Sequence, residues 1–178
     1  MTSAAPLLLA SFPLALIAAA LSDLQRFIIP NWISLFLIAG FAVAFAGGAA
    51  MGGLGFADLA GHLGVGAGGL LLGFALWACG LWGGGDGKLL AAAALWFDPS
   101  SAVQLMFAVV LCGGACAVIA LLLNRYRSVL VMIPGIGLLP FEKYAQTVPY
   151  GLPIAAGAIL ALPNSGLYQA LSTPAGVS

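Results

Sequence analysis

Apolar residues occur in long runs along this chain, and short segments rich in glycine, proline or charged residues separate the runs. A helix that crosses the hydrocarbon core of a bilayer, about 30 Å thick, needs about 20 apolar residues. The pattern predicts six such helices, at residues 4–21, 31–50, 60–81, 86–98, 101–123 and 146–163. We therefore expect an all-α fold, a polytopic bundle of transmembrane helices, in which residues 1–178 form a single domain with no separate soluble domain.

The fourth run is shorter than the others, because about 12 residues at about 1.5 Å each cover only about 18 Å. The positions of the basic residues favour a crossing over a re-entrant segment. With six crossings, one side of the membrane holds every break that carries a basic residue, namely Arg26, Lys88, Arg125, Arg127 and Lys143. The positive-inside rule makes this side cytoplasmic, so both termini are expected in the periplasm.

The composition supports a protein whose main solvent is lipid. Hydrophobic residues make up 63% of the chain and charged residues 6%, whereas a soluble domain has about 25% charged residues. The formal net charge is zero, so the clustered basic surface that a nucleic-acid partner would require is not expected.

Metal and cysteine chemistry are poorly supported. The three cysteines, Cys79, Cys112 and Cys116, lie in apolar runs and form no CxxC pair, which argues against a zinc module or a disulfide framework. The single histidine, His62, is separated from Asp86 by about 20 helical residues, or about 30 Å. It is therefore too far away to serve as the base of a serine or cysteine nucleophile there. We expect no metal and no cofactor.

The third run carries two pairs of glycines at helical spacing, Gly64 with Gly68 and Gly69 with Gly73. Small residues at this spacing let helix backbones approach closely inside a membrane, where the hydrophobic effect does not favour helix association. We interpret them as a packing signal.

Two acidic residues are the main candidates for chemistry. Asp23 follows the first predicted span, and Asp86 ends a run of three glycines between the third and fourth. Six crossings place both at the cytoplasmic face. When two carboxylates come close, one pKa rises, so one can act as a base on water while the other acts as an acid. This arrangement predicts an aspartic-type peptidase; the alternative is a membrane transporter or a proton or cation channel that uses the same aspartates.

Residues beside Asp86 have plausible supporting roles. Gly83 and Gly85 can adopt unusual backbone angles and let a substrate or a neighbouring helix come close to the carboxylate. Lys88 can hold a carboxylate ionised or contact a substrate, but it can equally extend to the membrane interface.

These residues resemble a known family, the type IV prepilin peptidases, which are membrane aspartic peptidases with a GxGD motif. The motif matches at Gly83, Gly85 and Asp86, with Lys88 after it. Asp23, followed by Ile-Pro-Asn at 29–31, matches an earlier motif. The segments Val-Pro-Tyr-Gly at 148–151 and Ile-Ala-Ala-Gly at 154–157 are similar to the late motif of the family. The resemblance covers about residues 11–162 and is greatest to the small peptidases of Flp, or tight-adherence, pilus systems.

The resemblance implies that Asp23 and Asp86 are the catalytic pair of a single transmembrane peptidase domain. Supporting or substrate-binding roles fall to Gly83, Gly85, Lys88, Pro30 and Asn31. It further implies cleavage of short, basic leader peptides from prepilin or pseudopilin substrates at the cytoplasmic face of a bacterial inner membrane.

This chain lacks two motifs that related membrane proteases carry, and one non-enzymatic alternative stays open. Larger family members carry a cysteine quartet and methylate the new amino terminus; this chain lacks the quartet, so methyltransferase activity is not expected. Presenilin-like proteases also use GxGD but pair it with a Tyr-Asp motif, which is absent here. A purely structural subunit of a pilus-assembly system is the remaining alternative.

Overall fold

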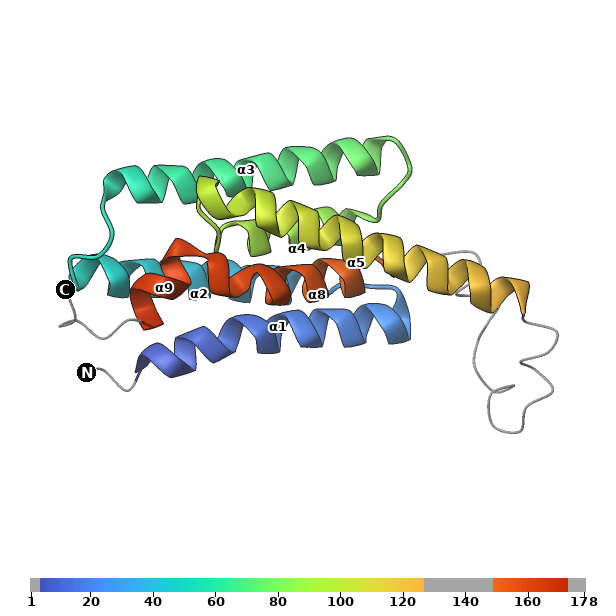
Figure 1. Cartoon of the computed structure of the whole chain (residues 1–178), viewed down its shortest axis with the longest axis horizontal. Coiled ribbons are helices and arrows are strands. Elements are labelled where there is room, and N and C mark those ends of the chain that lie inside the picture. Colours follow the sequence, from blue (N-terminus) through green and yellow to red (C-terminus); the bar gives the residue numbers. More distant parts are fainter. Residues whose placement is uncertain (1–3, 127–148, 173–178) are drawn as a thin grey trace.

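The computed structural model describes residues 4–126 and 149–172, and every regular element in this part of the chain is a helix (Figure 1). The elements are α1 (Ala4–Arg26), α2 (Asn31–Ala50), α3 (Phe56–Ala78), α4 (Gly84–Ala94), α5 (Pro99–Arg125), α8 (Gly151–Ala161), a 3-10 helix (Leu162–Asn164) and α9 (Gly166–Ser172). The predicted all-α fold is therefore confirmed.

Within the described residues, four helices are long and apolar enough to cross a bilayer, namely α1 from Leu7, α2, α3 and α5. The bent pair of Gly151–Asn164 and Gly166–Ser172, with 56° between its parts, would make a fifth span. At 11 residues α4 does not meet this criterion, so the sixth crossing stays a prediction. Residues 146–148 of the sixth predicted run lie outside the described part, as do Arg127 and Lys143.

The short helices α4 and α8 form the centre of the bundle. Helix α4 packs on α3 and α2, and α8 packs between α5 and α1. Leu89 and Leu90 of α4 and Ile154 and Ala158 of α8 are fully buried. The long outer helices instead expose large apolar side chains, such as Leu71 at 70%. Large apolar side chains on the outer surface are typical of a bundle embedded in lipid.

Glycines bring α3 and α4 into backbone contact. A Cβ added at Gly73 would lie 2.4 Å from the Cα of Gly87, and one at Gly69 would lie 3.1 Å from the Cβ of Ala94. The packing prediction is thus confirmed for Gly69 and Gly73. Gly64 and Gly68 lie on another face of α3, where an added Cβ would meet nothing within 4 Å, so the packing prediction is wrong for this pair within the described residues.

Polar residues at the end of the bundle where α5 begins have structural partners. His62 is 1% exposed, and its Nδ1 lies 2.9 Å from the carbonyl oxygen of Leu95, at the C-terminal end of α4. Asp98 caps α5 and also accepts a 2.9 Å hydrogen bond from the Gly166 amide. Burial acts to raise the pKa of Asp98, but hydrogen bonds from Ser100, Ser101 and Gly166 lower it well below its usual range. His62 thus contacts the C-terminal end of α4, whereas Asp86 lies in the first turn of that helix.

Candidate active site

Asp23 lies within the last turn of α1, not after the helix as its sequence suggested. The helix continues to Arg26 because the next proline is Pro30, and the amide of Phe27 donates a 2.8 Å hydrogen bond to the carbonyl oxygen of Asp23. Phe27 then adopts φ +54°, a left-handed conformation that ends the helix and turns the chain toward α2. The side chain of Asp23 is consequently buried inside the bundle, with 5% exposed.

Asp86 occupies the first turn of α4. Its Oδ2 accepts a 2.9 Å hydrogen bond from the amide of Gly83, the residue that caps the helix. The carboxylate thus satisfies an amide that the helix leaves without an internal partner. Only 8% of Asp86 is exposed.

The glycines before Asp86 serve close packing rather than unusual backbone angles. Gly83 is extended at φ −76°, and the positive φ of this loop is at Gly80, at +73°. A Cβ at Gly85 would lie 3.2 Å from the Cβ of Ile29, in the link between α1 and α2. The expectation of unusual angles at Gly83 is therefore wrong. Gly85 allows a close approach, which the link between α1 and α2 makes rather than a helix.

Asp23 has a partner far away in the sequence. The amide of Gly151, the first residue of α8, donates a 2.7 Å hydrogen bond to Oδ2 of Asp23. A Cβ at Gly151 would lie 2.8 Å from that oxygen and 3.0 Å from Cδ1 of Ile29. Since the N-terminus of a helix carries partial positive charge, α8 favours a negative charge at this position.

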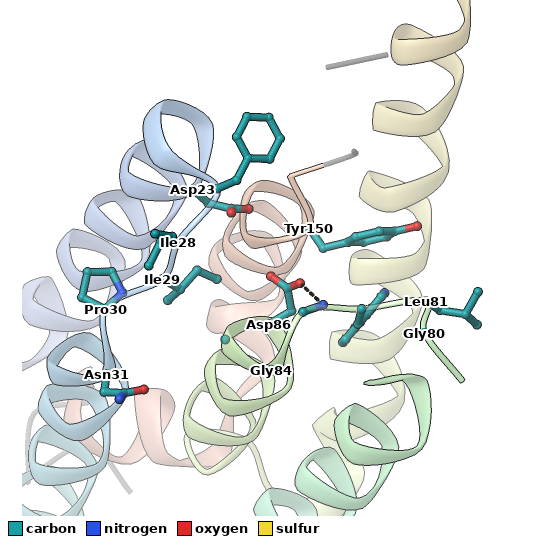
Figure 2. Close-up of a pocket in the computed structure, with 14 residues that line it drawn as sticks. Asp23, Ile28, Ile29, Pro30, Asn31, Gly80, Leu81, Gly84, Asp86 and Tyr150 are labelled. Atoms are coloured by element: carbon teal, nitrogen blue, oxygen red, sulfur yellow. Dashed lines mark hydrogen bonds between the residues drawn. The ribbon is translucent and has the colours of Figure 1, made fainter. Parts of the chain in front are cut away.

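Both carboxylates point into one cavity of about 860 Å³, from α1 and from α4 (Figure 2). Residues from three separate parts of the chain line it: Asp23, Phe27, Ile28, Ile29, Pro30, Asn31, Gly80, Leu81, Trp82, Gly83, Gly84, Gly85, Asp86 and Tyr150. The structure therefore brings together all the site residues expected from the sequence except Lys88. Lys88 lines a neighbouring cavity, and its Nζ donates a 3.2 Å hydrogen bond to Oδ1 of Asn31.

Two aromatic residues that no sequence pattern singled out also line the cavity. The rings of Trp82 and Tyr150 are 5.4 Å apart between centroids. Trp82 lies in a short glycine-rich loop with no helical periodicity, so no local pattern indicates where its ring points. Tyr150 carries a signal only through the similarity of segment 148–151 to the late family motif; Val148 lies outside the described residues.

Asp86 lies outside the four long spans. Its position in the cavity makes ionisation of its carboxyl group unfavourable. Burial raises the pKa of Asp86 to about 6, the hydrogen bond from the Gly83 amide opposes this rise, and the charge of Asp23 adds to it. The two carboxylates are thus close enough to influence each other. Within residues 4–126 and 149–172, no three His, Cys, Asp or Glu side chains gather in a way that could hold a metal ion.

The sequence model of the type IV leader peptidase family matches residues 10–118. This range contains Asp23, Asp86, the link between α1 and α2 and the glycine-rich loop before α4. No curated protein and no solved structure matches the chain.

Proposed function

Because the chain belongs to the type IV leader peptidase family, we propose that it is an aspartic-type endopeptidase whose catalytic pair is Asp23 and Asp86. Family membership and the long apolar helices indicate a membrane protease that acts on prepilin-like substrates. The observation that carries the proposal is that two buried carboxylates, from helices that are distant in sequence, open into one cavity.

The two aspartates have different surroundings, which suggests different roles. Asp23 accepts a hydrogen bond from the N-terminal amide of α8, so we assign it the ionised form and the role of general base. Asp86 has a raised pKa, so we assign it the protonated form and the role of general acid. Two carboxyl groups that share one proton titrate as a pair, as in other aspartic peptidases.

In the proposed reaction, the Asp23 carboxylate removes a proton from a water molecule, and the resulting hydroxide adds to the carbonyl carbon of the scissile peptide bond. The proton of Asp86 passes to the carbonyl oxygen, which gives a neutral tetrahedral intermediate. Asp23 then donates its proton to the leaving nitrogen, the C–N bond breaks, and Asp86 recovers its proton from the hydroxyl group. No metal or cofactor is needed to balance these steps.

The remaining wall residues position the substrate in this proposal. Gly83 and Gly85 leave space beside Asp86, and Pro30 and Asn31 form the facing wall. Trp82 and Tyr150, whose rings are tilted by 39° to each other, supply an aromatic surface for a substrate side chain. Lys88 acts from the neighbouring cavity through its hydrogen bond to Asn31.

The cavity is proposed to face the cytoplasm of a bacterial inner membrane. Helices α1 and α5 end on the same side of the bundle as the loop between α3 and α4 (Figure 1), and this loop lines the cavity. The last turns of α1 and α5 hold Arg26 and Arg125. Basic residues concentrate on the cytoplasmic side of membrane proteins. With α4 as a short crossing, six spans would leave both termini in the periplasm, as the sequence predicts.

A cleavage assay tests the proposed function. Purified protein in detergent should cleave a prepilin-like peptide, and Asp23→Asn or Asp86→Asn should each abolish cleavage without loss of helix content. The matched control is Asp58→Asn, which changes an acid at the N-terminus of α3, at the other end of the bundle. Retained cleavage in either of the first two variants would remove the pair from the mechanism. Ion or solute flux in liposomes without peptide products would instead support a transporter or channel.

A further inference from the structure

A second cavity, of about 580 Å³, runs along the outside of the bundle between α2, α3 and α4. We refer to it as the side groove. Leu35 and Ile38 of α2 and Leu63 and Leu70 of α3 form much of its walls, and all four side chains are at least 43% exposed. Because α2 and α3 are two of the long apolar helices, the groove opens toward lipid.

The side groove has one polar end. Asn31, Ser34 and Lys88 are the polar residues of its lining, and all three lie near the N-terminal ends of α2 and α4. The rest of the lining is apolar or glycine. Along α2 the lining extends from Asn31 to Ile38, which is about 10 Å of helix. The groove is therefore polar at one end and apolar over the remainder of its length.

Lys88 brings a positive charge to the polar end. Its side chain is exposed, and its Nζ donates a 3.2 Å hydrogen bond to Oδ1 of Asn31. Among the described residues, Lys88 forms no ion pair. An ammonium group has three donors, so two of them stay available for a ligand. The polar end thus offers a positive charge and two hydrogen-bond donors to an anionic group.

Exposed tryptophans mark this end of the bundle as the level of the lipid headgroups. Trp32 follows Asn31 and is 59% exposed, and Trp77, near the C-terminal end of α3, is 52% exposed. A Cβ added at Gly84, the first residue of α4, would lie 3.9 Å from Nε1 of Trp77. Tryptophan is enriched where the hydrocarbon core meets the headgroups. Lys88, one turn beyond Gly84, therefore lies at this boundary.

We propose that the side groove binds one anionic phospholipid of the phosphatidylglycerol class. The ammonium group of Lys88 pairs with the lipid phosphate, and an acyl chain lies along Leu35, Ile38 and Leu70. Charge complementarity selects this occupant, because a phospholipid carries a negative group at the level of Lys88 and an apolar chain below it. Basic pockets between transmembrane helices bind anionic headgroups in this way. The inference goes beyond the proposed function and does not depend on it.

Lipid binding to the purified protein in detergent tests this assignment. Native mass spectrometry measures the fraction of protein that carries phosphatidylglycerol, or phosphatidylcholine with the same acyl chains. The wild type should bind one phosphatidylglycerol with an apparent Kd about fivefold lower than that for phosphatidylcholine, which is the contribution of one basic residue beside an anionic headgroup. Saturation with phosphatidylglycerol should also raise the Tm, since the lipid binds only the folded protein.

Variants of Lys88 test the headgroup contact. Lys88→Gln removes the charge and should abolish the preference for phosphatidylglycerol, whereas Lys88→Arg retains the charge and should keep the preference. The matched control is Arg125→Gln, which removes a positive charge at the end of α5, outside the lining of the groove. It should also keep the preference.

Filling the groove tests the acyl-chain contact. Ala67 lines the groove and is exposed, so Ala67→Trp adds volume there and should cause loss of both bound lipids. Leu35→Trp, on the α2 wall, makes the same test from the other side. Ala75→Trp is the control, because Ala75 is exposed on α3 and lines neither cavity; it should bind both lipids as the wild type does. Circular dichroism checks the helix content of each variant.

Other outcomes would overturn the assignment. Equal binding of the two lipids by the wild type, or an unchanged preference in Lys88→Gln, would remove the headgroup contact. Retained lipid in folded Ala67→Trp or Leu35→Trp would show that the chain does not lie in the groove. Inorganic phosphate that displaces phosphatidylglycerol at equal concentration would identify a site for phosphate alone. A changed oligomeric state of Ala67→Trp with unchanged lipid binding would identify the groove as an interface between two copies of the chain.

Discussion

The amide of Gly151 donates a 2.7 Å hydrogen bond to the carboxylate of Asp23, a residue 128 positions earlier in the chain. The bond joins the N-terminus of α8 to the last turn of α1. The late segment of the chain is thus part of the site that the two aspartates form, since it holds one of them in place.

Gly151→Ala should uncouple Asp23 from its partner. The new Cβ would lie 2.8 Å from Oδ2 of Asp23 and 3.0 Å from Cδ1 of Ile29, so the carboxylate must move. A displacement of about 1 Å at a reacting group can cost about 100-fold in rate. We expect kcat to fall by about this factor with little change in KM, measured in the peptide assay. The control is Gly113→Ala on α5, whose Cβ would come no closer than 3.9 Å to Pro153; equal activity losses in both variants would contradict the role of Gly151.

The rate should depend on pH through Asp86. Its pKa is raised to about 6, so Asp86 keeps its proton up to that pH and loses it above. If Asp86 is the general acid, kcat/KM should fall as pH rises through about 6, and it should also fall at low pH, when the general base becomes protonated. The measurement is kcat/KM across about pH 4 to 8, and a flat profile over this range would argue against a shared proton.

Asp86→Asn should change how stability depends on pH. The pKa of Asp86 is above its usual value of 3.8, so burial favours the protonated form. The associated stability is fully present below about pH 4 and is lost as pH rises through about 6. The Tm of the wild type in detergent should therefore decrease over this range, and the Tm of Asp86→Asn should decrease less. Parallel curves of Tm against pH for the two proteins would show that folding does not raise the pKa of Asp86.

Gly73→Ala should force α3 and α4 apart. The added Cβ would lie 2.4 Å from the Cα of Gly87, the residue that follows Asp86. Overpacking of this kind costs about 1–3 kcal/mol, and here it also moves a proposed catalytic residue. We expect a lower Tm together with a reduced kcat. A Cβ added at Gly68, on the same helix, meets nothing within 4 Å, so Gly68→Ala should change neither Tm nor kcat. Equal effects of the two variants would contradict the role of the contact between Gly73 and Gly87.

Much of the fold could be read directly from the order of residues. Long apolar runs separated by glycine, proline and charged residues determine an all-α membrane protein, because only helices and closed barrels satisfy their backbone inside a bilayer. The local contact of Asp86 with the Gly83 amide is also encoded by sequence, since a carboxylate three residues after a helix cap can reach back to it. The position of Asp23 and Asp86 at the edges of predicted spans was enough to select them as candidates, because a charged side chain there is costly.

Only the tertiary structure decided which groups meet. Three contacts join segments that are distant in sequence. They are the hydrogen bond from Gly151 to Asp23, the packing of Ile29 against Gly85 and Gly151, and the hydrogen bond from Lys88 to Asn31. Lipid tails are as apolar as the side chains that face them, so hydrophobicity along the chain does not reveal which face of a helix meets another helix. That choice depends on close packing of small residues and on hydrogen bonds between helices, and both exist only once the bundle has formed.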